Sequence, residues 1–495
     1  MRTVAEVVRW RARRHPRLPM TWYMGRSRSF AEVDASSSAL AAGLVTRLGI
    51  ESQDRVAILD KNSDRYLELV FAIDKAGAVC VPLNWRLTAA EVVQVVEDAE
   101  PRLLVVGEEF RGLTERLNCR VVGLSELPRG TEDPHRDRED AVAWMLYTSG
   151  TTGRPKGVML RNLNLFSLIG PLGFEVPELR EGSRALVAMP LYHIGGIGWG
   201  LAVVSSGATA VIVREVVPQD LLQLLVEQRV ATGFVVPAVL LFLTQVPEVR
   251  GLRFPDLRNL VYGASPIAED LLRRSIETFG CRFTQVYGLT ETTGAITALT
   301  HEHHRGSQLL SCGRPMFGQE IRVVGPHGEE LPAGEVGEVE YRGPGSMAGY
   351  WRQPEETAAV LRGGWLRTGD AGCVDDDGFV YIRDRIKDVI ITGGENVYPA
   401  EVEGALVAHP AVADCAVIGV PDDRWGETVK AIVVRRPGTT VTEAELIAWT
   451  RGRLAGFKRP RSVDFVESIP RNPSGKVLKR QLREPYWAGR ERRVN

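Results

Sequence analysis

Apolar segments of two lengths alternate along much of this chain, and this alternation constrains its fold more than any other feature. Residues 55–59 and 78–82 have the length and composition of strands, whereas residues 66–76 between them have the length of a helix. Further strand-length runs occur at residues 103–106, 120–124, 141–146, 185–189, 208–213, 233–236, 260–262 and 283–287. Strands that alternate with helices favour parallel α/β layers, so the sequence predicts the α/β class.

Three of the later strands end in loops of glycine, small and hydroxyl residues. These loops read Pro190-Leu-Tyr-His-Ile-Gly-Gly, Gly263-Ala-Ser-Pro and Gly288-Leu-Thr-Glu-Thr. In open α/β sheets the ligand crevice lies outside the carboxyl ends of the strands. The sequence therefore predicts a ligand site at this edge of a sheet.

A loop rich in glycine and threonine follows the strand at residues 141–146, where residues 147–158 read Tyr-Thr-Ser-Gly-Thr-Thr-Gly-Arg-Pro-Lys-Gly-Val. Glycine lets the backbone approach a ligand, and hydroxyls and bare amides donate hydrogen bonds to anionic oxygens. Arg154 and Lys156 add positive charge, so the loop suits a polyphosphate. A plain surface turn is the alternative, because the same residue types dominate turns. The Walker pattern fails, because Lys156 is followed by glycine instead of Ser or Thr.

Composition argues against several classes of protein. The 495 residues suffice for roughly two to four domains, and the net charge of −1 does not favour nucleic-acid binding. The six cysteines include no Cys-x-x-Cys pair, which argues against a zinc site and a disulfide framework. The N-terminus lacks the apolar core of a signal peptide, and the longest uncharged apolar run, residues 231–243, is too short to span a bilayer. We expect a cytoplasmic protein, with peripheral membrane contact and a homodimer left open.

The chain changes character after these strands. Residues 319–341 contain short strands and turns typical of a small β subdomain. Residues from about 386 onward carry their own strands and helices, with helix starts at Pro399 and at the capping box Thr442-Glu-Ala-Glu. We predict a large N-terminal domain, residues 1–385, of mostly parallel α/β layers plus the β subdomain, and a small α+β C-terminal domain, residues 386–495.

Several motifs together resemble those of the adenylate-forming, or AMP-binding, superfamily. Residues 147–158 are similar, almost word for word, to its phosphate loop, and the superfamily contains acyl-CoA synthetases, peptide-synthetase adenylation domains and beetle luciferases. The similarity to acyl-CoA synthetases, including fatty-acid-CoA ligases, extends from about Ser29 to Glu484. The resemblance implies a mobile C-terminal domain and an enzyme that uses ATP, Mg²⁺ and coenzyme A with a small-molecule carboxylic acid.

The same resemblance implies an ATP site. Tyr287 looks like the ring that stacks on adenine, Thr290 like the residue that meets the α-phosphate, and Glu291 like the Mg²⁺ ligand. These residue types suit such roles, because a ring stacks on a base and carboxylate oxygens suit magnesium. Asp370 and Arg385 resemble the pair that holds the ribose. The implied ATP-binding residues are Thr148, Ser149, Gly150, Thr151, Thr152, Gly153, Lys156, Gly263, Ala264, Ser265, Tyr287, Gly288, Asp370 and Arg385.

Motifs near the C-terminus resemble the moving parts of the family. Lys476, at the end of Arg-Asn-Pro-Ser-Gly-Lys, is similar to the family's catalytic lysine. Lys387 falls at the hinge about which the C-terminal domain turns, where many relatives have aspartate. Gly393 and Gly394 resemble the segment that lines the channel for the pantetheine arm of CoA.

Two half-reactions follow from this resemblance. The substrate carboxylate attacks the α-phosphorus of ATP, which gives an acyl-adenylate and pyrophosphate, and a thiol then attacks the adenylate. The protein must mainly position anions and neutralise charge, with Thr290, Glu291 and Lys476 as catalytic residues and Glu291 and Thr151 on the metal. Rotation about Lys387 would withdraw Lys476 before the second step.

The expected acyl pocket consists of residues 192–200, 234–241 and 263–265. Several glycines leave space there, and the residues expected to face the acid are His193, Gly196, Gly198 and Val236. A dicarboxylate would need a cation for its second acid, because burying an unpaired charge is costly, and these segments contain none. The sequence favours a monocarboxylic fatty acid of medium to long chain, with an aryl acid as the second choice.

Two alternative functions stay open. An adenylating enzyme could load a carrier protein, but the short segment at residues 381–397 lacks the insertion of the family's fatty acyl-AMP ligases, so CoA is the expected acceptor. A non-catalytic nucleotide-binding protein belongs to a different class. It is disfavoured because the residues expected for catalysis are all present, namely Thr290, Glu291, Asp370, Arg385 and Lys476.

Overall fold

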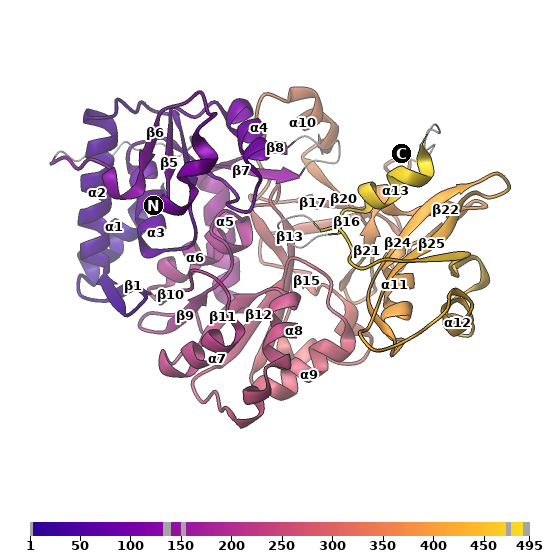
Figure 1. Ribbon diagram of the computed structural model, residues 1–495. Coiled ribbons are helices and arrows are strands. Elements are labelled where there is room, and N and C mark those ends of the chain that lie inside the picture. Colours follow the sequence, from indigo (N-terminus) through magenta and orange to yellow (C-terminus); the bar gives the residue numbers. More distant parts are fainter. Residues whose placement is uncertain (1–2, 132–139, 150–154, 472–476, 489–495) are drawn as a thin grey trace. The chain divides into compact units, whose positions relative to one another are not determined.

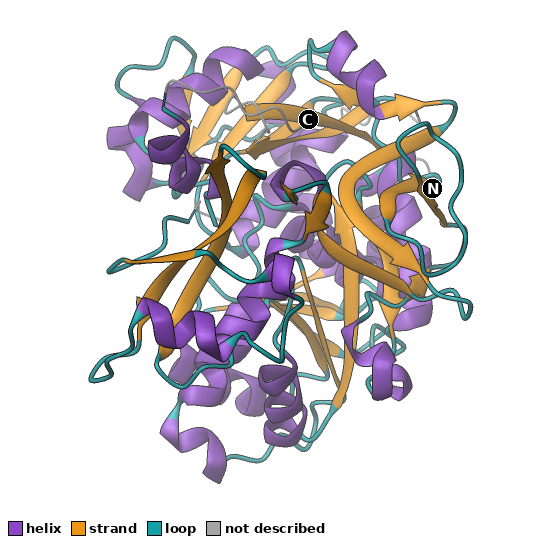
Figure 2. Cartoon of the chain, turned by 90° about the vertical axis from the view of Figure 1, so that its right-hand side faces the viewer, coloured by secondary structure: helices purple, strands orange, loops and turns teal. Residues whose placement is uncertain are grey.

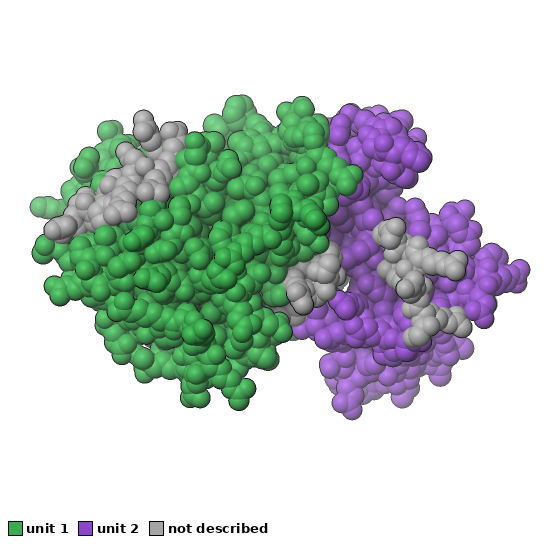
Figure 3. Space-filling view, turned by 90° about the horizontal axis from the view of Figure 1, so that it is seen from above, with its two compact units in different colours: residues 1–321, 341–366 green, residues 322–340, 367–495 purple. Residues whose placement is uncertain are grey.

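The computed structural model describes residues 3–131, 140–149, 155–471 and 477–488. The chain forms two compact units, a large unit of residues 1–321 and 341–366 and a small unit of residues 322–340 and 367–495 (Figure 3). The chain contains both helices and strands (Figure 2), and each unit has both, so the predicted α/β class is confirmed. In the described part of the chain, no helix combines the length and hydropathy needed to cross a bilayer.

One sheet of the large unit has the strand order β15-β14-β13-β12-β11-β9-β10-β1-β2. Strands β13 to β1 along this order run parallel, and the pairs at both ends are antiparallel. The bounds are β1 Pro19–Tyr23, β2 Arg26–Ser29, β9 Arg184–Val187, β10 Thr209–Ile212, β11 Thr232–Val235, β12 Asn259–Gly263, β13 Arg282–Leu289, β14 Gly294–Leu299 and β15 Arg314–Pro315.

A second sheet of the large unit has the order β18-β8-β7-β4-β3-β5-β6. Its strands are parallel from β7 to β6, whereas β8 and β18 are antiparallel to their neighbours. The bounds are β3 Arg55–Leu59, β4 Val79–Pro82, β5 Leu103–Val106, β6 Val121–Gly123, β7 Val142–Ser149, β8 Pro155–Arg161 and β18 Gly349–Tyr350. Strands β7 and β8 include the two ends of the predicted phosphate loop, residues 147–149 and 155–158.

Several helices of the large unit begin where the sequence carries cap signals. Ser29 and Glu32 form the predicted capping box of α2, and Thr88 and Glu91 form another at α4. The bounds are α1 Val4–Arg14, α2 Phe30–Thr46, α3 Asp64–Lys75, α4 Ala89–Ala99, α5 Asn162–Glu175, α6 Ile194–Ser206, α7 Pro218–Glu227, α8 Pro237–Gln245, α9 Glu269–Phe279 and α10 Pro354–Val360.

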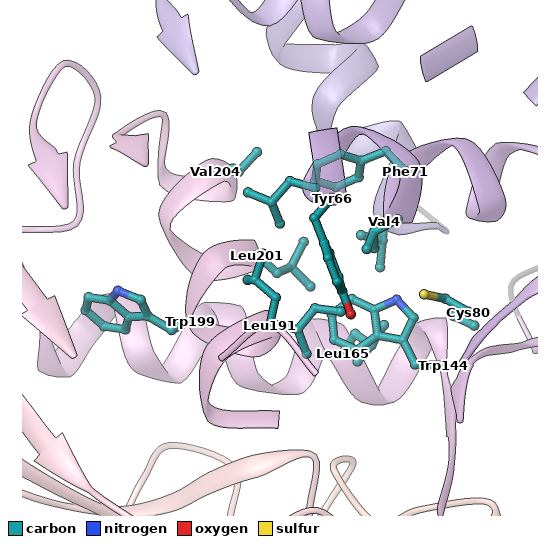
Figure 4. Packing of buried hydrophobic residues seen from close by; sticks show 14 of the residues in the cluster. Val4, Tyr66, Phe71, Cys80, Trp144, Leu165, Leu191, Trp199, Leu201 and Val204 are labelled. Carbon is teal, nitrogen blue, oxygen red and sulfur yellow. The ribbon is translucent and has the colours of Figure 1, made fainter. Parts of the chain in front are cut away.

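The main core of the large unit lies between its two sheets. Helices α1, α3 and α6 occupy this layer (Figure 1), and apolar residues of both sheets belong to one buried cluster with them. Tyr66 and Phe71 of α3, Trp144 of β7 and Leu201 of α6 pack in this cluster (Figure 4). Only Arg65 among the residues of α3 is not buried. Such a helix, covered on all sides, holds the two sheets and their strand-end loops in place.

The small unit contains most of one sheet and all of another. The first has the order β16-β17-β20-β19, with β21 on β20, and the second has the order β23-β22-β25-β24, with β26 on β25. The strand bounds are β16 Glu320–Val324, β17 Gly337–Arg342, β19 Leu361–Arg362, β20 Trp365–Val374, β21 Val380–Arg385, β22 Ile390–Thr392, β23 Glu395–Val397, β24 Val412–Asp422, β25 Gly426–Arg435 and β26 Ser462–Phe465. The helices are α11 Pro399–Val407, α12 Glu443–Trp449 and α13 Lys479–Trp487.

The border between the compact units differs from the boundary predicted at residue 385. It falls within β16, β17 and β20, so residues 367–385 group with the C-terminal residues. The physical reason is that β20 and β21 pair over residues 370–385 and form one sheet. A boundary of movement at residue 385 stays a prediction.

Candidate active site

A pocket lies at the carboxyl ends of β11, β12 and β13 in the large unit. Its walls, which come from these strands and from β14, α5 and α6, enclose about 510 Å³, part of which is open to solvent. His193, Ala264, Tyr287 and Gly288 of the predicted site line it. Among its described lining residues none is charged, so the pocket suits an apolar group. Its place at the carboxyl ends of parallel strands is where the sequence predicts a ligand.

Two glycines of the predicted ATP site lie where strands approach each other closely. A Cβ at Gly263 would lie 2.2 Å from the carbonyl oxygen of Val286, and one at Gly288 would lie 1.8 Å from that of Gly294. Ala264 has a φ of +67°, a left-handed conformation that is uncommon outside glycine. Such strained positions cluster at ligand sites. The glycines therefore allow the strand ends to approach each other. Ser265, which follows Ala264, does not line the pocket.

The glycines expected to face the acid are corrected by the structure. A Cβ at Gly196 would lie 2.0 Å from the carbonyl oxygen of Pro190, so this residue faces backbone and not the pocket. Gly198 lies behind the wall, where a Cβ would meet Leu168 at 2.8 Å. Val236 is half-buried and is also not part of the lining. Gly195 lines the pocket instead, because one residue along a helix turns the chain by about 100°.

Aromatic side chains form a firm part of the pocket wall. Trp199 donates a hydrogen bond from Nε1 to the Leu186 carbonyl at 2.8 Å, and its ring centroid lies 6.0 Å from that of Phe234. His193 caps the N-terminus of α6, where its Nδ1 accepts a hydrogen bond from the Gly195 amide at 3.1 Å. This bond leaves the proton of a neutral His193 on Nε2. The wall therefore combines fixed rings with one polar side chain.

Asn62 holds the loop that leads into this wall. Its amide nitrogen donates to the Met189 carbonyl at 2.9 Å, and its Oδ1 accepts from the Leu191 amide at 2.8 Å. Asn62 is buried, so both bonds are shielded from water. The sequence offered no signal for this role, because the bonds join residues 127 and 129 positions apart.

The turn that carries Thr290 and Glu291 is tied down by its neighbours. Thr292 Oγ1 accepts from the Leu289 amide at 2.9 Å, and Thr293 Oγ1 donates to the Gly345 carbonyl at 2.6 Å. The Met347 amide donates to the Glu291 carbonyl at 2.9 Å. The turn is therefore built to hold its side chains in fixed positions.

Glu291 and Lys156 both contact Tyr350, and Lys156 also contacts Glu356, two residues that the sequence analysis missed. Tyr350 donates a hydrogen bond from its hydroxyl to Glu291 Oε1 at 3.0 Å, and Lys156 Nζ lies 5.1 Å from the centre of the Tyr350 ring. Lys156 also forms an ion pair with Glu356 at 2.5 Å. The structure thus brings the predicted metal ligand and the predicted phosphate-binding lysine to one aromatic side chain.

The Glu291 carboxylate is a ligand of the type that suits a magnesium ion. Oε1 accepts the Tyr350 hydrogen bond, and among the described residues no hydrogen bond reaches Oε2. The residue is half-buried, and a carboxylate oxygen is the ligand type that Mg²⁺ prefers. Thr151, the other predicted ligand, lies outside the described residues.

Asp370 and Arg385, the residues predicted to hold the ribose, form an ion pair in the small unit. They face each other across β20 and β21, and Arg385 Nε lies 2.9 Å from Asp370 Oδ1. Arg385 also donates to the Thr368 carbonyl at 3.1 Å. The Asp370 side chain is 5% exposed, so this cross-strand ion pair is a fixed feature of the unit.

The predicted hinge and channel residues also lie in the small unit. Lys387 is exposed, and partial desolvation of its ammonium group by the surrounding chain lowers its pKa, an effect that neighbouring Asp388 partly offsets. Gly393 and Gly394 form the β22–β23 turn with φ of +61° and +86°, where glycine is favoured. A Cβ at Gly393 would lie 2.7 Å from the Trp425 ring.

Several predicted residues fall outside the part of the chain that the structure describes. They are Gly150, Thr151, Thr152, Gly153 and Lys476. Thr148 and Ser149 end β7, and Thr148 pairs with Lys156 across the hairpin.

Comparisons with known families match nearly the whole chain. A profile described as AMP-binding enzyme matches residues 8–351, and one described as AMP-binding enzyme C-terminal domain matches residues 401–476. The chain belongs to the AMP-binding enzyme family. The resemblance inferred from the motifs is therefore confirmed.

Relatives within this AMP-binding family act on different acids and acceptors. The fatty acid–[acyl-carrier-protein] ligase ScoC of Streptomyces coeruleorubidus is 40% identical over 100% of this chain and 98% of its own length. Feruloyl-CoA synthase of an Amycolatopsis species is also 40% identical, over 96% of this chain and 97% of its own. The family thus includes fatty-acid ligases and aryl-acid ligases.

A solved structure supports the fold of this AMP-binding enzyme. o-Succinylbenzoate CoA synthetase from Bacillus subtilis, determined with its acyl-adenylate, has a TM-score of 0.90 and 32% identity, and the match covers 96% of this chain and 97% of that one. The same enzyme was also determined with ATP and a magnesium ion. Adenylate-forming enzymes of this family use ATP, Mg²⁺ and, in the CoA ligases, coenzyme A.

Proposed function

We propose that this protein is an ATP-dependent acid–thiol ligase that activates a monocarboxylic fatty acid of medium to long chain and transfers it to CoA. The observation that carries the proposal is the pocket, whose described lining is uncharged and includes Tyr287 and Gly288. A second carboxylate buried there would lack a cation, which is costly. Membership of the AMP-binding family supports adenylation as the first step.

In the proposed first step, the carboxylate of the acid attacks the α-phosphorus of ATP and pyrophosphate leaves. Lys156 holds the β- and γ-phosphates as a cation, Thr290 donates to the α-phosphate, and Tyr287 stacks on adenine. Glu291 holds Mg²⁺, which would screen the phosphate charge when bound. Lys476 supplies positive charge between the carboxylate and the α-phosphate. Preorganised charge of this kind lowers the barrier without rearrangement during the reaction.

In the proposed second step, the thiol of CoA attacks the carbonyl carbon of the adenylate and AMP leaves. Asp370 and Arg385 hold the ribose through both steps. The chain turns at Lys387, so that Lys476 leaves and the turn of Gly393 and Gly394 admits the pantetheine arm. A cytoplasmic location, expected from the sequence, stays a prediction.

An aryl acid is the second candidate for the substrate. The rings of Trp199 and Phe234, which are tilted by 55° to each other, offer a surface on which a flat acid could pack. Feruloyl-CoA synthase is a relative at 40% identity, which also supports this candidate. A carrier protein is the second candidate for the acceptor, because ScoC, at the same identity, bears the name of a carrier-protein ligase.

A panel of acids and acceptors tests the proposal. Purified protein with ATP and Mg²⁺ is given octanoate, dodecanoate, ferulate or a dicarboxylate, and pyrophosphate release reports adenylation. Thioester formation is then measured by mass spectrometry with CoA or with a phosphopantetheinylated carrier protein. We expect release with the fatty acids and thioester with CoA. Activity on the dicarboxylate alone, or thioester on the carrier protein alone, would contradict the substrate or the acceptor, respectively.

A further inference from the structure

Tyr350 lies between two predicted ATP-site residues that are far apart in the sequence. Its side chain is buried, and its hydroxyl donates to Glu291 Oε1 at 3.0 Å. Its ring faces Lys156, whose Nζ lies 5.1 Å from the ring centre, within the range of a cation–π contact. One side chain thus touches both the carboxylate expected to bind the metal and the cation expected to bind the phosphates.

The backbone around Tyr350 fixes this arrangement. Tyr350 pairs with Val158 in the antiparallel ladder of β18 and β8, two residues beyond Lys156. The Tyr350 amide donates to Thr357 Oγ1 at 2.9 Å, which ties the strand to α10. Glu356 precedes Thr357 in the same helix. The contacts therefore hold Tyr350, Lys156 and Glu356 as one assembly.

Tyr350 contacts one of the two oxygens of the Glu291 carboxylate. Its hydrogen bond occupies Oε1, and the Met347 amide fixes the backbone of the same residue at 2.9 Å. Groups that hydrogen-bond a metal-binding carboxylate set its orientation and tune metal affinity. The Tyr350 hydrogen bond to Oε1 of Glu291 leaves Oε2 of the same carboxylate for a cation.

Glu356 is paired with Lys156, the cation that the phosphates of a bound nucleotide would need. The Lys156 side chain is 10% exposed and forms a 2.5 Å ion pair with Glu356, which is 45% exposed. Phosphate oxygens would bind the same ammonium group, so the carboxylate and the nucleotide compete for it. The more exposed partner, Glu356, is the one that can move away into water.

We infer that Tyr350 is a positioning residue that aims Glu291 at the metal and Lys156 at the phosphates, and that nucleotide phosphates displace Glu356 from Lys156. This inference rests on the proposed function, because it assumes that ATP binds at this site. It adds two residues that the motifs alone do not assign.

Direct nucleotide binding tests the inference without turnover. Isothermal titration with α,β-methylene-ATP is carried out on the full-length protein, with and without Mg²⁺. In Tyr350→Phe the ring stays but the hydrogen bond is lost, so we expect Mg²⁺ to enhance binding about 10- to 100-fold less than in the wild type. Binding without Mg²⁺ should change less than about 2-fold, because the ring still faces Lys156.

A control variant separates this effect from the general loss of a tyrosine hydroxyl. Tyr381 donates to Asp375 Oδ2 at the same 3.0 Å, so Tyr381→Phe removes a matched hydrogen bond elsewhere. It should leave both titrations unchanged. Equal effects of Tyr350→Phe and Tyr381→Phe would overturn the role of Tyr350, as would an unaltered Mg²⁺ enhancement in Tyr350→Phe.

Glu356→Gln tests the competition. Removing the carboxylate should raise the affinity for the analogue without Mg²⁺ by about 2- to 5-fold, the range of a partly exposed ion pair. Its neighbour Glu355 is exposed, and Glu355→Gln serves as the matched control with no expected change. Unchanged or weaker binding in Glu356→Gln would overturn the displacement. Absence of nucleotide binding by the wild-type protein would instead contradict the proposed function itself.

Discussion

Alanine at two adjacent glycines tests where the acyl pocket lies. Gly195 and Gly196 both belong to the first turn of α6, but they face different surroundings. A Cβ at Gly195 would lie 3.0 Å from Cε1 of Phe234, a residue of the pocket wall. A Cβ at Gly196 would lie 2.0 Å from the carbonyl oxygen of Pro190. We expect Gly195→Ala to change acid preference and Gly196→Ala to lower stability.

The distances set the expected magnitudes. Ordinary contact begins at 3.4 Å, so the Pro190 carbonyl would have to move by about 1.4 Å in Gly196→Ala. Asn62 pins the residues on both sides of Pro190, so we expect a loss of about 3 kcal/mol, the upper end for overpacking. Gly195→Ala requires the edge of the Phe234 ring to move by only a few tenths of an ångström. Alanine also has a higher helix propensity than glycine, by up to about 1 kcal/mol. Its net change in stability should therefore lie below about 1 kcal/mol.

The assay pairs unfolding with an acid panel. Urea unfolding followed by circular dichroism measures stability, and pyrophosphate release with octanoate, dodecanoate and ferulate measures preference. One methyl group in an apolar pocket changes relative rates by about 10- to 200-fold. Gly170→Ala is the control, because a Cβ there would meet nothing within 4 Å. A stable Gly196→Ala with altered preference, beside an unaltered Gly195→Ala, would refute the pocket wall described above.

Three further predictions concern charge. Glu291→Gln should strongly weaken pyrophosphate release at limiting Mg²⁺, because the amide removes an anionic ligand, and full release would contradict the metal site. Lys476→Ala should reduce adenylation by about 10²-fold but should still convert synthetic acyl-adenylate and CoA into thioester. Gly394→Leu should show the reverse. Equal loss of both steps in both variants would contradict separate roles. Burial lowers the pKa of His304 to about 4. In the unfolded chain, His304 therefore takes up its proton at a higher pH than in the folded protein. As the pH falls from about 6.5 to about 4, this difference should lower the free energy of unfolding by about 3 kcal/mol. Urea unfolding across this range should show a steeper loss in the wild type than in His304→Asn, and parallel curves would contradict it.

Local signals in the sequence predicted much of the fold. The capping boxes at Ser29 and Thr442 are present in the structure, because such caps involve residues only three positions apart. The strands at residues 55–59 and 103–106 match β3 and β5 residue for residue. Buried strands of a parallel sheet are apolar throughout, so their composition alone marks them.

The structure brings only some of the predicted site residues together, and their roles stay predictions. The motif residues Tyr287 and Gly288 line the pocket, and Asp370 pairs with Arg385. Gly196 was wrongly placed in the pocket, because composition shows that a glycine leaves space but not which side of the helix it faces. The border of the compact units was likewise not visible, because it depends on pairing between β20 and β21.

The sequence by itself determined the α/β class, the AMP-binding family and the strand-end loops, because these depend on composition, periodicity and motifs within short stretches of chain. Only the tertiary structure decided that Tyr350 meets Glu291 and that Glu356 meets Lys156, contacts that join residues 59 and 200 positions apart. Tyrosine and glutamate are ordinary surface and packing residues in a sequence. Their partners are set by which strands lie side by side, and that arrangement follows from the burial of the whole core between the two sheets.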